Sequence, residues 1–317
     1  MMNSWYYRLR RASAMAMATC ALCASAWSIV WRHDRDANLY IDLAAQPQFA
    51  SVGQFGIHNN GNFNGFGSGT LIADGRWVLT AAHVVDVDFL SAPGDLFFRL
   101  GDSVYQAEAF YIHSRWNGDI TNGGDIALVR LTQQVSGVTP ALLYQATNSL
   151  VAQTGYSVGF GGNGNGQDGY TDFDDTRRAM ENIIDVYGSV IDSLPDDVFL
   201  SDFDSPSSDT NTLSDFGSGA EPLYLEGMGA PGDSGGAVFV QIDGVWYLAG
   251  VHSFLADANA FGASWGNEEP DARYGDVLGS VRVDYYADWI NATVPEPTSM
   301  AALAVGVLGL LARRRRA

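Results

Sequence analysis

Short β-prone runs separated by turns rich in Gly, Asn and Asp fill most of this 317-residue chain, and they limit its fold more than any other feature. The clearest runs lie at residues 69–72, 77–80, 126–131, 236–240 and 245–251. No apolar repeat with the period of a helix is sustained between them. The pattern therefore predicts an all-β domain. Residues 285–290 are expected to close this domain as a short helix.

Two segments are expected to form long surface loops. Residues 161–169 are rich in Gly and Asn, and residues 202–219 are acidic. Both compositions favour turns over strands, and such connecting segments usually run over the protein surface.

The N-terminus has the layout of a secretory signal peptide. Three arginines within residues 8–11 precede an alanine-rich apolar run that ends in Ala24-Ser25-Ala26, so cleavage is expected after Ala26 and residues 1–26 form the signal. A membrane helix that stays attached is the alternative. Both cysteines, Cys20 and Cys23, lie in this segment. The mature protein is therefore expected to have no disulfide and to depend on its core for stability.

The C-terminal residues 291–317 combine three elements in a fixed order. The motif Val-Pro-Glu-Pro-Thr at 294–298 is followed by an apolar stretch at 300–312 and by four arginines at 313–316. The stretch is short for a membrane-spanning helix, and the arginines favour a cytoplasmic end. This arrangement resembles the PEP-CTERM sorting signal of Gram-negative bacteria. The resemblance implies transient membrane anchoring, processing by an exosortase and delivery to the cell surface or extracellular matrix; a plain tail anchor is the alternative.

The net charge of −19 argues against nucleic acid as a partner, because a polyanion would be repelled. Seven of the 17 basic residues lie within residues 8–11 and 313–316, so the body of the chain is more acidic still. We interpret this acidity as a contribution to solubility rather than as a cation-binding site, and we expect no cofactor and no metal.

The motif Gly-Asp-Ser-Gly-Gly at 232–236 carries the strongest chemical signal in the chain. Its glycines permit a tight turn that exposes the Ser234 hydroxyl, and the backbone N–H groups of such a turn can converge to form an oxyanion hole. A serine hydroxyl is a poor nucleophile at neutral pH. It needs a base, normally a histidine that a buried carboxylate holds in place.

His83 and Asp125 are the candidates for that base and that carboxylate. His83 follows the apolar run at 77–79, where a buried strand emerges into a loop. Asp125 opens the apolar run at 126–131, a position where a carboxylate is partly buried and needs a partner. The order of His83, Asp125 and Ser234 along the chain, rather than any one motif, predicts a serine hydrolase.

With these residues in this order, the chain resembles the trypsin and chymotrypsin family over residues 49–290. The family pattern is also matched at 69–72 and 282–290. The resemblance implies two six-stranded antiparallel Greek-key β-barrels, at about 49–140 and 141–290, with the active site in the cleft between them.

The resemblance also assigns roles to the residues of the site. His83 would act as general base, Asp125 would orient it, and Ser234 would attack the scissile carbonyl. The backbone N–H groups of Gly232 and Ser234 would stabilise the oxyanion.

Supporting residues follow from the same resemblance. The hydroxyls of Thr80 and Ser253 would hydrogen-bond the Asp125 carboxylate. Asp233 would pair with a new N-terminal ammonium after processing, because a buried carboxylate needs a partner. No Ile-Val-Gly-Gly start is evident, so residues 27–48 are an N-terminal segment or a propeptide, and the activation mode stays open.

Two positions depart from trypsin itself. Met228 stands six residues before Ser234, where trypsin has an aspartate that pairs with Lys or Arg of the substrate, so cleavage after basic residues is not expected. His252 stands where glutamate-specific relatives carry a histidine that binds an acidic side chain, which makes it a candidate for the specificity pocket. The alternative is a histidine that only packs beside Ser253.

We therefore expect a monomeric, secreted or surface-associated serine endopeptidase that forms an acyl-enzyme on protein or peptide substrates, with signal peptidase and an exosortase as processing partners. The serine motif also fits the nucleophile elbow of α/β-hydrolases. That fold needs the triad histidine after the serine and an alternating α/β pattern, and here only His252 follows. A catalytically silent protease-like surface protein is the second alternative, and the complete triad argues against it.

Overall fold

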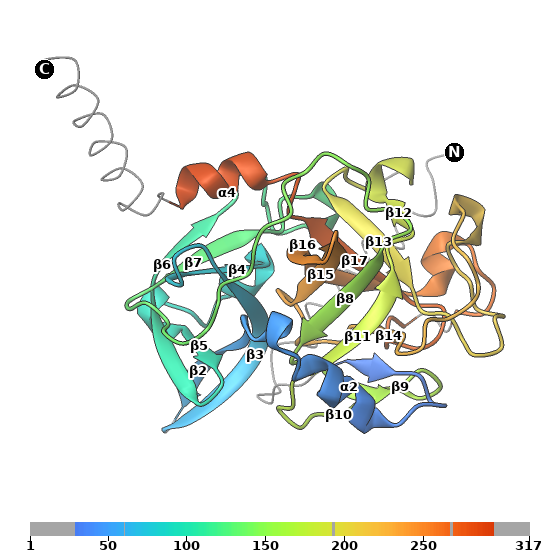
Figure 1. The fold of residues 1–317 in the computed structure, drawn as a ribbon, viewed down its shortest axis with the longest axis horizontal. Helices are drawn as coiled ribbons and strands as arrows, with labels where there is room; N and C mark the ends of the chain where they lie inside the picture. The colour runs from blue at the N-terminus through green and yellow to red at the C-terminus, as the bar shows by residue number, and fades with distance from the viewer. Residues whose placement is uncertain (1–28, 60, 192–193, 267–268, 295–317) are drawn as a thin grey trace, which may run out of the picture.

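The computed structural model describes residues 29–59, 61–191, 194–266 and 269–294. Figure 1 shows a mostly β protein in which two β-rich halves lie side by side. The predicted signal peptide and the apolar, arginine-rich tail lie outside the described residues. Within the described ranges, no helix is long and apolar enough to cross a membrane.

The first half is a closed six-stranded antiparallel barrel, as predicted. Its strands are β2 (Val52–Asn59), β3 (Asn62–Ile72), β4 (Trp77–Thr80), β5 (Phe97–Leu100), β6 (Ser103–Ile112) and β7 (Ala127–Leu131). They follow the order β2-β3-β4-β7-β6-β5, and β5 pairs back onto β2. The ring centroids of Phe55 and Phe98 lie 5.1 Å apart in its core. Closure leaves the barrel without an unpaired edge.

The second half is a seven-stranded antiparallel sheet rather than a second closed six-stranded barrel. Its strands are β8 (Thr154–Gly159), β11 (Arg178–Ile183), β12 (Val186–Tyr187), β13 (Val198–Asp202), β15 (Ala237–Ile242), β16 (Val245–Ala256) and β17 (Val277–Arg282). The order is β11-β8-β15-β16-β17-β13-β12, so the sheet curves into a half-barrel whose two edge strands do not pair with each other.

Side chains join β11 and the connection after it to the end of β13 at a place that we call the seam, formed by Asn182, Asp185 and Asp202. β11 pairs with β8, whereas β12, which follows two residues later, pairs with β13. At the interruption, Asn182 Nδ2 donates to Asp202 O at 2.8 Å, and the Asp202 backbone N–H donates to Asp185 Oδ2 at 3.2 Å. Polar side chains thus replace the backbone ladder that would have closed the predicted barrel.

The described part of the N-terminal segment is built into the second half. β1 (Val30–Trp31) pairs with β14 (Gly227–Met228) and with β9 (Asn163–Asn165), and β10 (Gly169–Asp172) completes this four-stranded sheet. The predicted loop at 161–169 therefore contains strands, because pairing with β1 satisfies its backbone. Helix α2 (Ala37–Ala44) follows, and the carboxylate of Asp36 caps it by accepting from Asn38 N at 2.9 Å.

The acidic segment at 202–219 is partly buried, which corrects the prediction of a surface loop. Asp202 is 1% exposed and Asp204 is 4% exposed. Leu213 N donates to Asp202 Oδ2 at 2.8 Å, and Asp204 N donates to Glu226 Oε1 at 2.7 Å. The carboxyl groups of Asp202 and Glu226 tolerate burial because they accept these hydrogen bonds from backbone N–H groups, whereas Asp204 Oδ1 has no partner among the described residues.

The predicted C-terminal helix is present as α4 (Ala287–Thr293). Just before and within it, the rings of Tyr286 and Trp289 pack edge-on against His113 at the end of β6, with centroids 4.7 and 5.1 Å apart. The end of the second half is thus tied to the barrel. Short 3-10 turns lie at Pro47–Phe49, Pro93–Asp95, Ile120–Asn122, Gly188–Val190, Ser214–Phe216 and Ala258–Phe261.

Candidate active site

His83 and Asp125 are brought together by two neighbouring strands of the barrel. β4 and β7 pair so that Thr80 lies opposite Ala127. The one-turn helix α3 (Ala82–Val85) begins directly after β4 and carries His83, and Asp125 lies two residues before β7. The His83 backbone N–H donates to Asp125 Oδ1 at 2.9 Å, and its ring Nδ1 lies 2.8 Å from Oδ2. Strand pairing therefore sets this contact.

The Asp125 carboxylate takes a further hydrogen bond from the second half. Asp125 is 1% exposed, and the Ser253 hydroxyl on β16 donates to Oδ2 at 2.5 Å. The contact expected of Thr80 is wrong, because its hydroxyl donates to Ser68 O at 2.8 Å. A hydroxyl carries one hydrogen, so Thr80 has none left for Asp125.

His83 and Asp125 change each other's pKa in opposite directions. Although burial alone would lower it, the Asp125 carboxylate raises the pKa of His83 above its ordinary value. Burial alone would raise the pKa of Asp125, but the His83 ring and the hydrogen bonds from His83 and Ser253 lower it. The ionised carboxylate thus holds the ring with Nδ1–H toward it, which leaves Nε2 able to accept a proton.

Ser234 lies in a turn that packs against the ends of β3 and β4. Ser68 N on β3 donates to Ser234 O at 2.8 Å. Gly235, with φ +79°, sits so close to β4 that a Cβ would lie 2.1 Å from Thr80 Oγ1. Only glycine fits at this position. The serine turn is thereby held against the strand end that leads into His83.

Two backbone donors in this turn are available for a ligand. Gly232 has a left-handed conformation, with φ +96°. Its carbonyl accepts from the Ser68 hydroxyl at 3.2 Å, which fixes the orientation of the peptide unit. Within the described residues, no hydrogen bond uses the N–H of Gly232 or of Ser234. Both can therefore donate to an oxyanion.

Asp233 is buried beside the nucleophile and is surrounded by backbone donors. It is 1% exposed, and it accepts from Gly161 N at 2.7 Å, from Ala230 N at 2.9 Å and from Ile29 N at 3.1 Å. Burial raises its pKa to about 7, and the hydrogen bonds from Ala230 and Ile29 offset part of that rise. The contact of Ile29 was not expected from the sequence; the Ile-Val pair at 29–30, shortly after the alanine-rich run that ends at Ala26, was the available signal.

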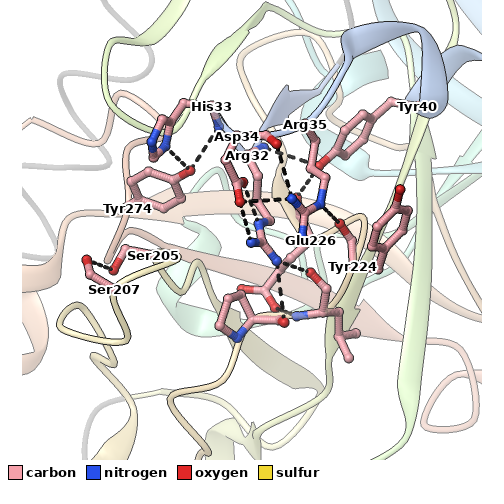
Figure 2. A network of polar contacts seen from close by, with 12 residues as sticks. Arg32, His33, Asp34, Arg35, Tyr40, Ser205, Ser207, Tyr224, Glu226 and Tyr274 are labelled. Carbon is pink, nitrogen blue, oxygen red and sulfur yellow. Dashed lines mark hydrogen bonds and ion pairs between the residues drawn. The ribbon is translucent and has the colours of Figure 1, made fainter.

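A polar network holds the N-terminal segment in place (Figure 2). Arg32 forms an ion pair with Asp34 at 2.8 Å and donates from Nη1 to Leu223 O at 2.7 Å. Tyr40 Oη donates to Glu226 O at 2.8 Å and accepts from Arg32 N at 3.2 Å. Because these contacts seat β1 beside β14, they also support the position of the residue that precedes β1.

The two predicted specificity residues are both buried. Met228 is 0% exposed and pairs with Val30, and His252 is 1% exposed. His252 N donates to Gly236 O at 2.8 Å, and neither ring nitrogen has a partner among the described residues. Burial lowers the pKa of His252 to about 4, so the ring is neutral at neutral pH. A role for either residue in a specificity pocket stays a prediction.

No group of three or more His, Cys, Asp or Glu side chains that could hold a metal ion occurs within the described ranges. A cavity of about 440 Å³ is lined by His33, Gln167, Ser205, Pro206, Ser207, Asp209, Thr210 and Tyr274. None of these residues belongs to the triad or to the serine turn. The cavity is therefore separate from the candidate active site.

Two family models match the chain. Residues 46–184 match the model described as Trypsin, and this range includes His83 and Asp125. Residues 293–316 match the model described as PEP-CTERM protein-sorting motif. Ser234 lies outside the first range, so its assignment rests on the geometry of its turn.

Proposed function

We propose that this chain is an exported serine endopeptidase, because residues 46–184 match the Trypsin model and residues 293–316 match the PEP-CTERM protein-sorting motif. The observation that carries the proposal is the buried Asp125 carboxylate, which accepts hydrogen bonds from His83 and, across the two halves, from Ser253. The Ser234 turn packs against the strand end that leads into His83. Nucleophilic catalysis by a serine requires this combination of groups.

In the proposed reaction, Ser234 Oγ attacks the carbonyl carbon of the substrate while its proton passes to Nε2 of His83. Asp125 stabilises the imidazolium, and the N–H groups of Gly232 and Ser234 bind the oxyanion. Collapse of the tetrahedral intermediate breaks the C–N bond, and His83 gives the proton to the leaving amine. Water then attacks the acyl-enzyme with His83 again as base, which releases the acid and restores Ser234.

Labelling by a fluorophosphonate probe tests this proposal on the exported, processed protein. The wild type is expected to be labelled, and Ser234→Ala is expected to lose the label while it keeps the circular dichroism spectrum of the wild type. Equal labelling of both proteins would assign the reactive group elsewhere. Absence of label from both would instead support the catalytically silent surface protein.

We further propose that the active form begins at Ile29. The Ile29 nitrogen lies 3.1 Å from Asp233 Oδ2, and the residue is wholly buried. Cleavage of the Ser28–Ile29 bond would make this nitrogen an ammonium, which would give the buried carboxyl group a cationic partner. The same cut would remove the φ torsion of +55° at Ile29, which is strained for a β-branched residue. This start lies two residues beyond the cleavage expected after Ala26.

N-terminal sequencing of the exported, active protein tests the start site. We expect Ile29 as the first residue, and Asp233→Asn is expected to lower kcat because it removes the anion that holds the ammonium. An active protein that begins at another residue would rule this start out.

We propose that cleavage is not directed to Lys or Arg, because Met228 supplies no carboxylate to pair with them. A preference for acidic side chains through His252 is the weaker hypothesis, since burial keeps this ring neutral. A library of peptides should show little cleavage after Lys or Arg, and efficient cleavage there would refute the interpretation of Met228. Persistence of an acidic preference in His252→Ala would remove the second hypothesis.

The PEP-CTERM motif supports export and anchoring of the protein at the surface through its C-terminus. We propose that signal peptidase and an exosortase process a monomeric enzyme at the surface or in the extracellular matrix of a Gram-negative bacterium. Deletion of residues 293–316 is expected to release the enzyme into the medium. Unchanged retention at the surface would contradict this role of the motif.

A further inference from the structure

Asp197 reaches from the second half to the loop that carries Asp125. It lies directly before β13 and is 0% exposed. Its Oδ2 accepts a hydrogen bond from the backbone N–H of Gly124 at 2.7 Å and another from the Tyr286 hydroxyl. Gly124 is the residue immediately before Asp125. One buried carboxylate thus contacts the peptide unit adjacent to the predicted triad aspartate.

The loop before Asp125 has little conformational restraint of its own. Gly123 and Gly124 both have left-handed conformations, with φ +75° and +82°. Glycine loses more conformational freedom on folding than any other residue, so this pair needs an external contact to hold one geometry. A Cβ on Gly123 would lie 2.5 Å from Asp197 Oδ1, so the loop backbone packs directly on the carboxylate.

Asp197 is itself held firmly. Its carbonyl accepts from Arg282 N at 2.7 Å, which ties its backbone to β17. Arg115 Nη1 lies 4.0 Å from its Oδ2 and partly balances its charge. Burial, and then the adjacent Asp197 carboxylate, raise the pKa of Tyr286, so its hydroxyl keeps the hydrogen that it donates. These contacts fix the position of the Asp197 carboxylate that accepts the hydrogen bond from Gly124.

We propose that Asp197 is a positioning residue that aligns the Asp125 carboxylate with His83. Two contacts from the second half then hold Asp125 from different sides: Ser253 bonds its side chain, and Asp197 bonds the backbone before it. The hydrogen bond between His83 and Asp125 has a length of 2.8 Å, so a displacement of 1 Å in the loop would break it. This inference rests on the proposed function.

The test compares three variants of the exported, processed enzyme on one peptide substrate. Asp197→Ala removes the acceptor, Asp197→Asn keeps an acceptor oxygen without the charge, and Asp185→Ala is a matched control that removes another buried carboxyl group bonded to a backbone N–H, at the seam. Steady-state kinetics are measured from pH 5 to pH 9, with the melting temperature of each variant.

For Asp197→Ala we expect kcat to fall about 10- to 100-fold with KM within about twofold, since misplacement by about 1 Å costs catalysis and not binding. The acidic limb of the kcat profile should also move to lower pH, because His83 loses the aligned carboxylate that raises its pKa. Asp197→Asn should restore most of kcat and the position of the limb. Asp185→Ala should change neither, even where its melting temperature falls.

Each result has a distinct meaning. Unchanged kcat and an unmoved limb in Asp197→Ala, with an active wild type, would overturn the positioning role alone, whereas an inactive and unlabelled wild type would overturn the proposed function. Loss of activity in Asp197→Asn equal to that in Asp197→Ala would also overturn it, because charge rather than position would then matter. If Asp197→Ala does not fold, Asp197→Leu replaces it, because leucine also removes the acceptor but keeps most of the side-chain volume, and an unchanged profile there would overturn the positioning role as well.

Discussion

The closed barrel and the seven-stranded sheet bury their charged groups very differently. Among the described residues between Val52 and Leu131, the barrel buries one carboxylate, that of Asp125. The second half buries Asp185, Asp197, Asp202, Asp204, Glu226, Asp233, Asp257 and Asp276. The barrel closes through its backbone and keeps an apolar core, whereas at the seam of the second half the side chains of Asn182 and Asp185 bond the backbone of Asp202.

This difference makes the second half sensitive to pH. Burial, followed by the neighbouring charge of Asp202, raises the pKa of Asp185 well above its ordinary value and the pKa of Asp204 to about 8. Both groups are therefore protonated at neutral pH in the folded protein, whereas they ionise near pH 4 in the unfolded chain. The folded state binds the extra protons, so the free energy of unfolding falls as the pH rises from about 4 toward 8.

The largest predicted effect concerns the one buried carboxylate of the barrel. Asp125→Asn should lower kcat by about 10⁴-fold, because an amide can donate to His83 and so favours the wrong tautomer of the ring. The melting temperature should change far less than kcat. We would measure kcat and the thermal unfolding of the same variant. A loss of activity that only follows a loss of folded protein would show that the buried carboxylate of the barrel serves stability rather than catalysis.

The next effect tests the apolar core of the barrel. Phe55→Ala should lower the free energy of unfolding by about 3–5 kcal/mol through lost burial and a cavity. Because Phe55 is 0% exposed and packs on Phe98, the loss should be the same at pH 5 and at pH 8.5. Urea unfolding at both pH values measures it. A loss that depends strongly on pH would show that the barrel is not independent of titrating groups.

The smallest predicted effect concerns the second half, where a substitution should raise rather than lower the free energy of unfolding. Asp204→Asn should raise the free energy of unfolding by about 1–3 kcal/mol at pH 8.5, because the variant cannot ionise in the unfolded state. Near pH 4 it should equal the wild type. Asp209→Asn, on the same segment but more exposed, is the matched control. Equal stabilisation at both pH values would mean that packing rather than ionisation is responsible.

Much of the site was predictable because its residues stand at strand ends. The apolar runs before His83 and after Asp125 predict two strands, and their pairing as β4 and β7 accounts for the contact between the two side chains. The contact of Ser253 with Asp125 was expected only from the family resemblance. Thr80 could not be assigned in this way, because the partner of a hydroxyl depends on which oxygen is closer, and here Ser68 O is nearer.

Other features escaped prediction because they depend on contacts between distant residues. The seam exists because Asn182 and Asp202 meet across the second half, and nothing in either local sequence indicates this. The composition of the segment at 202–219 predicted a surface loop. Asp202 and Leu213 are nevertheless buried, and the Leu213 backbone N–H donates to the Asp202 carboxyl group. A carboxyl group that accepts backbone hydrogen bonds can be buried, and composition does not show where those donors are.

The contact between Ile29 and Asp233 has a consequence for the timing of activity. It joins residues 204 positions apart, so it spans most of the folded chain. A chain exported with its N-terminus first presents Ile29 early and Asp233 only near the end. Contacts of such long range form late, after the segments between them have folded. The pocket that receives Ile29 is thus completed only after Asp233 has crossed, so under the proposed function activity would begin outside the cell.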